Sequence, residues 1–189
     1  MVVDIVLGLP RGGVIVAAQV AHELQRPLDV FIVRKLGHPL QREFAVGALA
    51  EPDVVVLDDN SLREQTHLRA RFDEIVAEET QRLREYRAKF HSQTAPELND
   101  RAVLIVDDGL ATGATAEAAV RGARQRGANR IVMAAPIASE EAVARLRRVA
   151  DDVCVLLTDP KFEAVGQFYK SFEQTTDEEV IALLRAANS

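Results

Sequence analysis

Two adjacent aspartates, Asp107 and Asp108, end an apolar run of strand length and precede a loop of small residues and a helical pattern. At such a junction the free N–H groups and the positive end of the helix dipole face the carboxyl edge of the sheet, where anions are stabilised. Glycine and alanine let a ligand approach the backbone, and threonine hydroxyls donate hydrogen bonds. The loop therefore predicts a phosphate cup formed by Ala111, Thr112, Gly113, Ala114 and Thr115.

The two acids need a different partner, because a carboxylate accepts hydrogen bonds and repels phosphate. Sugar hydroxyls and a nearby Mg²⁺ ion would both suit Asp107 and Asp108 beside a bound phosphate. The combination of acid pair and phosphate cup predicts a ribose 5-phosphate unit as the ligand, with Mg²⁺ as the cofactor.

The segment from Val103 to Thr115 resembles the thirteen-residue signature of the type I phosphoribosyltransferases, which bind 5-phosphoribosyl 1-diphosphate (PRPP). The resemblance implies that Asp107 and Asp108 contact the ribose hydroxyls and act on the metal indirectly, through water or the ribose. It also implies that the phosphate cup wraps the 5′-phosphate. Ala114 stands where many members of the family have a second glycine, which is a mild change if this residue needs no positive φ.

Two further segments agree with the same family. The segment from Gly8 to Gly13 resembles its diphosphate loop, and the resemblance allows unusual peptide geometry at Pro10. Arg34 and Lys35 end a second apolar run and resemble the Arg-Lys pair that precedes the family's mobile catalytic loop, which implies a catalytic role for both cations. The resemblance assigns diphosphate binding to Pro10, Arg11, Gly12 and Gly13.

Two segments are expected to cover the site. Residues 36–45 are predicted to form the mobile loop, because a glycine and a proline interrupt regular structure there, and its closure would exclude water. Residues 158–189 are predicted to form a small C-terminal hood, in which Phe162 and Tyr169 could stack on a planar acceptor. Packing of a C-terminal flap onto the core explains these aromatic side chains equally well.

The elements that must position these residues are apolar runs separated by helical patterns. Runs rich in valine and isoleucine, without polar alternation, are typical of strands that are covered on both faces. We therefore expect an α/β fold of the type I phosphoribosyltransferase kind: a mainly parallel, twisted sheet with helices on both faces, in a single domain over residues 1–189. The runs are residues 2–7, 28–33, 54–57, 102–106, 131–135 and 153–157.

Two additions to this sheet are expected from the pattern. Residues 45–50 and 54–58 are predicted to form an antiparallel hairpin on it. Residues 61–91 have apolar side chains at helical spacing and predict a long inserted helix, which begins at a capping box of Ser61 and Glu64. The chain starts at its first predicted strand, whereas the family usually has a helix there, so we expect a thinner cover on the neighbouring face.

The composition limits the remaining functions. Among 189 residues, 23 Lys and Arg stand against 29 Asp and Glu, and the net charge of -6 argues against a nucleic-acid partner. No apolar run has the ~18 residues that a bilayer span requires, so we expect a cytoplasmic protein with no membrane partner. The single cysteine, Cys154, lies in an apolar run and is expected to be buried.

These observations predict Mg²⁺-dependent transfer of the 5-phosphoribosyl group from PRPP to a nitrogenous acceptor, a nucleobase, with release of diphosphate. The alternative is a regulatory protein that binds PRPP or a nucleotide without turnover. The expected partners are PRPP, the small acceptor and a second copy of the chain in a homodimer.

Overall fold

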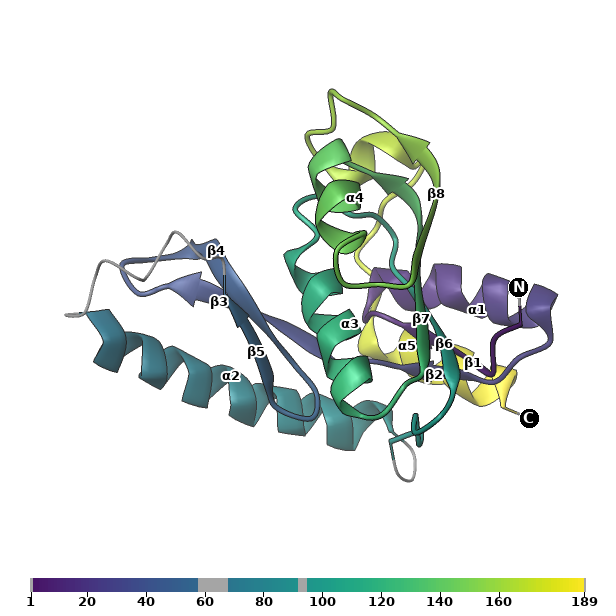
Figure 1. Ribbon diagram of the computed structural model, residues 1–189, viewed down its shortest axis with the longest axis horizontal. Helices are drawn as coiled ribbons and strands as arrows, with labels where there is room; N and C mark the ends of the chain where they lie inside the picture. Colours follow the sequence, from purple (N-terminus) through teal and green to yellow (C-terminus); the bar gives the residue numbers. More distant parts are fainter. Residues whose placement is uncertain (1, 58–67, 92–94, 189) are drawn as a thin grey trace.

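A five-stranded parallel sheet forms the centre of the protein (Figure 1). The computed structural model describes residues 2–57, 68–91 and 95–188. The strand order is β2-β1-β6-β7-β8, and every neighbouring pair is parallel, which confirms the sheet predicted from the apolar runs. The strands are β1 (Ile5–Gly8), β2 (Leu28–Val30), β6 (Ala102–Val106), β7 (Arg130–Ala138) and β8 (Asp152–Thr158).

Helices cover both faces of this sheet, as predicted. Successive residues of β6 face opposite sides: Leu104 belongs to the apolar core beside α1 and α5, and Ile105 belongs to the core beside α3 and α4. Burial on both sides explains why the central strands lack polar alternation. The four helices are α1 (Gly12–Leu24), α3 (Ala114–Gln125), α4 (Glu140–Leu146) and α5 (Asp177–Ala187).

A second, antiparallel unit projects from one side of the central sheet (Figure 1). We call it the arm; it consists of the sheet β3-β4-β5 and of helix α2, which packs along β3 and β4. The predicted hairpin is confirmed as the β4–β5 pair, but it belongs to this separate sheet and not to the central one. The bounds are β3 (Val33–His38), β4 (Gln41–Ala50), β5 (Val54–Leu57) and α2 (Arg69–Phe90).

Residues 36–45, predicted to form a mobile loop, instead belong to two strands and the turn between them. β3 and β4 form a hairpin that reverses at residues 39–40. Gly37 does not end the strand; it lies at an irregularity of the pairing, where a Cβ would collide with the backbone of Arg42. Leu36 is fully buried and fixes the base of the hairpin. Movement of the hairpin over a ligand stays a prediction.

The long helix is confirmed over its described part. α2 has 22 residues, about 33 Å at 1.5 Å per residue. Its buried residues recur at helical spacing, as the sequence pattern predicts. The capping box expected at Ser61 and Glu64 lies outside the described residues. The buried positions are Phe72, Ile75, Glu79, Leu83 and Phe90.

The hood predicted over residues 158–189 is too long. Its first part does lie beyond the carboxyl edge of the sheet, where the Tyr169 hydroxyl donates to the carbonyl of Asp108 at 2.7 Å. The chain then returns along the sheet as α5, whose Val180 and Leu184 are buried in the core beside α1. Their i, i+4 spacing creates an apolar stripe that requires a partner. α5 therefore adds to the cover of this sheet face.

Cys154 is exposed, contrary to the expectation from its apolar run. It lies on β8, which is an edge strand of the central sheet. Val153 and Val155 pack against the core, so Cys154 points to the opposite face. The alternation of the strand, and not the hydrophobicity of the run, decides the exposure of the thiol.

A buried ionic cluster joins the arm to the central unit. Glu51, at the turn between β4 and β5, is fully buried and forms an ion pair with Arg87 of α2 at 3.0 Å. His91, just after α2, contacts Glu51 at 3.2 Å and Asp29 of β2 at 3.1 Å. Arg126, which follows α3, reaches Glu51 at 3.6 Å. Burial alone would lower the pKa of His91, but these two carboxylates outweigh it and raise the pKa to about 9.

This cluster predicts a loss of stability at alkaline pH. Because the folded pKa of His91 lies above the unfolded value, its stabilising contribution is complete below about pH 6.5 and is lost as the pH rises through about 9. His91→Gln should lower the free energy of unfolding by up to about 3 kcal/mol at pH 6.5 and by much less at pH 10. Urea unfolding of both proteins across this range measures the difference. A difference that is constant with pH would contradict the assignment.

Candidate active site

The register of the central strands brings the diphosphate loop and the acid pair together. Gly8 at the end of β1 lies opposite Val106 at the end of β6, so the loops that follow them share one edge of the sheet. A Cβ on Gly12 would collide with the carboxylate of Asp108. The two predicted motifs are therefore in direct contact, and the Pro10-Arg11 peptide bond in the first of them is cis.

The acid pair lies in an environment that is unfavourable for its charges. Burial and the adjacent charge of Asp108 raise the pKa of Asp107 well above its usual range, and burial raises the pKa of Asp108. The Asp108 N–H donates to Asp107 Oδ1 at 2.9 Å, which relieves part of this cost. A cation or several hydroxyl donors at this position would be strongly favourable.

The phosphate cup has the expected backbone. Gly113 precedes α3 with a left-handed φ of 74°, and Ala114 is the first residue of the helix. The positive φ falls on the glycine, so the alanine at the family's second glycine position is tolerated. Ala111 and Thr112 are exposed, and the Thr112 hydroxyl accepts from the Ala114 N–H at 3.4 Å. The first turn of α3, including half-buried Thr115, thus opens toward the carboxyl edge.

Arg34 and Lys35 face different parts of the molecule, and the catalytic role expected for both stays a prediction. Arg34 Nε donates to Glu79 of α2 at 2.9 Å, and its guanidinium lies 5.3 Å from the ring centre of Tyr86. Lys35 is exposed, and its charge lowers the pKa of both Asp107 and Asp108. Adjacent residues of a strand point to opposite faces, so only Lys35 lies toward the acid pair.

Arg11 lies between the diphosphate loop and α5. Its guanidinium is 3.7 Å from Asp177 at the start of α5, and Lys89 binds the other oxygen of that carboxylate at 2.6 Å. The Arg11 side chain is half-buried and lines a cleft beside Gly12. Its predicted role in binding diphosphate stays a prediction.

The cleft at this edge has a volume of about 340 Å³ and connects the acid pair with the segment after β8. Tyr169 lines it, whereas Phe162 stacks on Phe168 with ring centres 5.6 Å apart and is not among its described lining residues. Stacking of an acceptor on either ring stays a prediction. The sequence analysis missed Phe172, which lies 5.2 Å from Tyr169, and Ile15 on α1. Both are partly exposed apolar side chains, but exposure cannot be read from their residue type.

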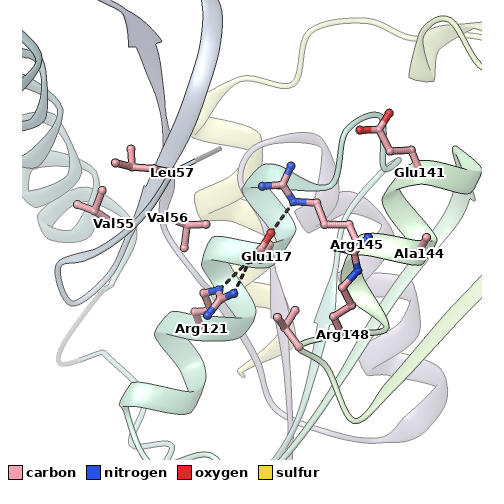
Figure 2. A pocket seen from close by; sticks show the side chains of 10 residues that line it. Val55, Val56, Leu57, Glu117, Arg121, Glu141, Ala144, Arg145 and Arg148 are labelled. Atoms are coloured by element: carbon pink, nitrogen blue, oxygen red, sulfur yellow. Dashed lines mark hydrogen bonds and ion pairs between the residues drawn. The ribbon is translucent and has the colours of Figure 1, made fainter. Parts of the chain in front are cut away.

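A second groove, of about 650 Å³, lies between β5, α3 and α4 (Figure 2). None of the predicted site residues line it. Its centre is Glu117 of α3, whose carboxylate accepts from Arg121 at 2.8 Å and from Arg145 of α4 at 2.5 Å. Burial would raise the pKa of Glu117, but the two guanidinium groups outweigh it and lower the pKa.

The structure is that of an α/β protein with a parallel sheet, whose carboxyl edge carries a partly buried acid pair beside a helix N-terminus. Comparison with known proteins makes the class specific. The chain belongs to the phosphoribosyl transferase domain family, whose model matches residues 3–169.

The relatives agree with this family. In two strains of Mycobacterium tuberculosis, proteins named "Putative phosphoribosyl transferase" are 48% identical over 186 residues, which is 97% of this chain and 42% of theirs. The chain thus spans about two fifths of the length of these curated relatives. The crystal structure of TT1426 from Thermus thermophilus is 41% identical, covers 97% of this chain and 88% of its own, and superposes with a TM-score of 0.79.

The two glycines of the diphosphate loop predict contrasting variants. In Gly13→Ala the new Cβ would lie 2.9 Å from the Asp107 Cα and the Val106 carbonyl oxygen, and these backbone atoms cannot rotate away. We expect the free energy of unfolding to fall by about 1–3 kcal/mol, and each kcal/mol should lower Tm by roughly 2–4 °C. In Gly12→Ala the Cβ meets only the carboxylate of Asp108, which can rotate, so Tm should change little while ligand binding is lost. Thermal melting with and without PRPP separates the two; equal losses of Tm would contradict the contacts.

Proposed function

We propose that this chain catalyses Mg²⁺-dependent transfer of the 5-phosphoribosyl group from PRPP to a nitrogenous acceptor, with release of diphosphate. The observation that supports this most directly is the contact of Gly12 and Gly13 with the acid pair, at the same sheet edge as the phosphate cup. A single ligand with a 5′-phosphate, a ribose diol and a 1-diphosphate could contact the phosphate cup, the acid pair and the diphosphate loop together. Neither a free phosphate nor a simple anion would use the two carboxylates.

In this proposal each loop binds one part of PRPP. The first turn of α3 holds the 5′-phosphate, and Asp107 and Asp108 accept hydrogen bonds from the ribose hydroxyls. Lys35, Arg11 and the N–H groups near Gly12 stabilise the departing diphosphate. The ribose gains positive charge as the bond to diphosphate lengthens, and the acid pair stabilises this charge. The bond from the acceptor nitrogen forms at the same carbon, and a base takes up the proton of the acceptor.

Mg²⁺ suits the donor set at this edge. The ion prefers oxygen ligands and is commonly bound by one or two carboxylates together with water and substrate phosphates. Asp107 and Asp108 supply two carboxylates whose raised pKa values make a neighbouring cation favourable. Within the described residues no group of three or more acidic, His or Cys side chains could hold a metal, so the remaining ligands would come from PRPP and water. When bound, the ion would neutralise charge on the diphosphate.

A nucleobase fits the cleft as the acceptor. Tyr169 and Phe172 form one side of the cleft, and Ile15 and Val16 of α1 also line it. Flat aromatic and aliphatic surfaces bind a planar ring, while Asp108 at the inner end places the ribose next to it.

Two expectations about the whole protein stay predictions. The part of the chain that the structure describes contains no helix with the length and apolar character to cross a membrane, and a cytoplasmic location is untested. A homodimer is also untested; exposed Leu156 and Leu157 on the edge strand β8 are available for a second copy.

Ligand-dependent melting tests the acid pair. Millimolar Mg²⁺-PRPP should raise Tm of the natural protein, and the double variant Asp107→Asn, Asp108→Asn should lose this rise. Without ligand the double variant should be at least as stable, because the amides remove two partly buried carboxyls that repel one another.

The matched control replaces another pair of adjacent aspartates, Asp151 and Asp152, at the opposite edge of the sheet. Asp151 accepts hydrogen bonds from Arg124 and from the Ile131 N–H, so this variant should have a lower Tm. It should keep the increase in Tm that PRPP causes. Absence of a PRPP effect on the natural protein would count against the function itself. If PRPP binds, release of diphosphate across a panel of nucleobases and amines decides between the transferase and a regulatory protein without turnover.

The two neighbouring cations of β3 give a second test. Lys35→Ala should raise KM for PRPP by about tenfold, because it removes a charge beside the acid pair and the diphosphate. Arg34→Ala also removes one positive charge, from the preceding residue. It should change KM for PRPP by less than about twofold, since Arg34 binds Glu79 of α2. Its effect should instead appear as a lower Tm. Steady-state kinetics with both variants measure this, and equal KM effects would refute the placement of the two side chains.

A further inference from the structure

The start of α4 is bonded to the loop that forms the phosphate cup. We call residues 110–113 the phosphate loop. The Leu110 N–H donates to the Ile137 carbonyl at 3.0 Å, and the Ser139 N–H donates to the Leu110 carbonyl at 2.9 Å. These bonds form an isolated parallel bridge between Leu110 and Ala138, two residues after Asp108, in the same register as the pairing of β6 and β7.

The Ser139 hydroxyl makes two hydrogen bonds at this point. It accepts from the Ala142 N–H at 3.0 Å as the N-cap of α4, and it donates to the Ala111 carbonyl at 2.5 Å. The first bond is an ordinary helix cap. The second is directed out of the helix and onto the phosphate loop.

The bond to Ala111 fixes the direction of an N–H group. A trans peptide unit is planar, and its C=O and N–H point in opposite directions. When Ser139 holds the Ala111 carbonyl, the N–H of Thr112 on the same peptide unit must point away from Ser139. It also keeps a carbonyl oxygen, which would repel a phosphate, on the α4 side of the loop.

Three side chains along one side of α4 contact the phosphate loop or the helix that follows it. Ser139 binds Ala111, as above. Ala142 Cα would lie 3.2 Å from a Cβ on Gly113, so the first turn of α4 packs directly against the loop. Arg145, three residues further on, donates to Glu117 of α3 at 2.5 Å (Figure 2). The i, i+3, i+6 spacing places all three on the side that faces the loop and α3.

We propose that Ser139 is a positioning residue for the 5′-phosphate of the ligand. It acts through the Ala111–Thr112 peptide unit, whose N–H it directs toward the phosphate cup, while Ala142 and the Arg145–Glu117 pair hold α4 in place. This inference rests on the proposed function, because the 5′-phosphate is the group that the phosphate cup would bind.

Two substitutions separate this role from helix capping. Ser139→Gly removes the donor to Ala111, and glycine at an N-cap lowers helix stability by only a few tenths of a kcal/mol relative to serine. Ser139→Thr keeps the hydroxyl and the cap. We expect Ser139→Gly to weaken binding of Mg²⁺-PRPP and of ribose 5-phosphate by about fivefold each, the effect of one hydrogen bond. Ser139→Thr should remain within about twofold of the natural protein.

Binding of diphosphate with Mg²⁺ distinguishes a specific effect on the 5′-phosphate from a general disturbance of the site. Diphosphate lacks the 5′-phosphate, so its affinity should be the same in all three proteins by titration calorimetry. A general disturbance of the site would weaken diphosphate as well, and that result would overturn the proposal, as would unchanged binding of ribose 5-phosphate. In kinetics, Ser139→Gly should raise KM for PRPP and change kcat by less than about twofold.

Asp4→Ala serves as the matched control. Asp4 accepts from the Ala102 N–H at 2.8 Å, a side chain to backbone bond at the opposite end of β6. Its loss should lower Tm without changing the affinity for any of the three ligands. If the natural protein binds neither Mg²⁺-PRPP nor ribose 5-phosphate, the proposed function fails; if it binds both and Ser139→Gly binds them equally well, only the role of Ser139 fails.

Discussion

Two adjacent, partly buried carboxyl groups follow the end of a parallel strand, and the unfavourable energy of their charges constrains this edge of the protein. Burial raises the pKa of Asp107 and Asp108, so their ionised forms are favourable only near compensating groups. The structure supplies part of this compensation through Lys35 and through the N–H of Asp108. A ligand with hydroxyl donors and an associated cation would supply the remaining compensation. The unfavourable charges of the acid pair therefore favour such a ligand over a simple anion. A side chain at position 12 would displace the Asp108 carboxylate, and one at position 13 would collide with the backbone of Val106 and Asp107.

The position of Lys35 depends on how the arm is attached. Lys35 belongs to β3 of the arm and not to the central sheet that carries the acid pair. The buried contacts of Glu51 with His91 and Arg87 fix one end of the arm against β2 and α3. On α2, Glu79 then holds Arg34, and the alternation of the strand leaves Lys35 on the other face. This charge network therefore leaves Lys35, and not Arg34, on the side of the acid pair.

Local patterns predicted the central sheet and the helices on both faces, because each depends on hydrophobicity and on the direction of parallel strands. The errors share one cause, which is tertiary packing. Residues 36–45 contain loop-forming residue types, yet strand pairing accommodates Gly37 at an irregularity. Cys154 lies in an apolar run, yet the edge position of β8 exposes it. Phe162 and Tyr169 are both aromatic, and only the fold decides that Phe162 stacks on Phe168 while Tyr169 reaches Asp108.

The residues that hold the phosphate loop could not be predicted from local sequence patterns either. Sequence motifs identify groups that meet a ligand, whereas Ser139 has the ordinary appearance of a helix cap. Its second bond arises because β7 ends at Ala138, the residue that bridges to Leu110, so the next residue, the cap, lies beside the Ala111 carbonyl. The strand register that aligns the ends of β1 and β6 therefore also brings β7 and α4 to the same edge. Three loops from three neighbouring strands meet there, and the orientation of backbone N–H groups in one of them depends on a side chain in another.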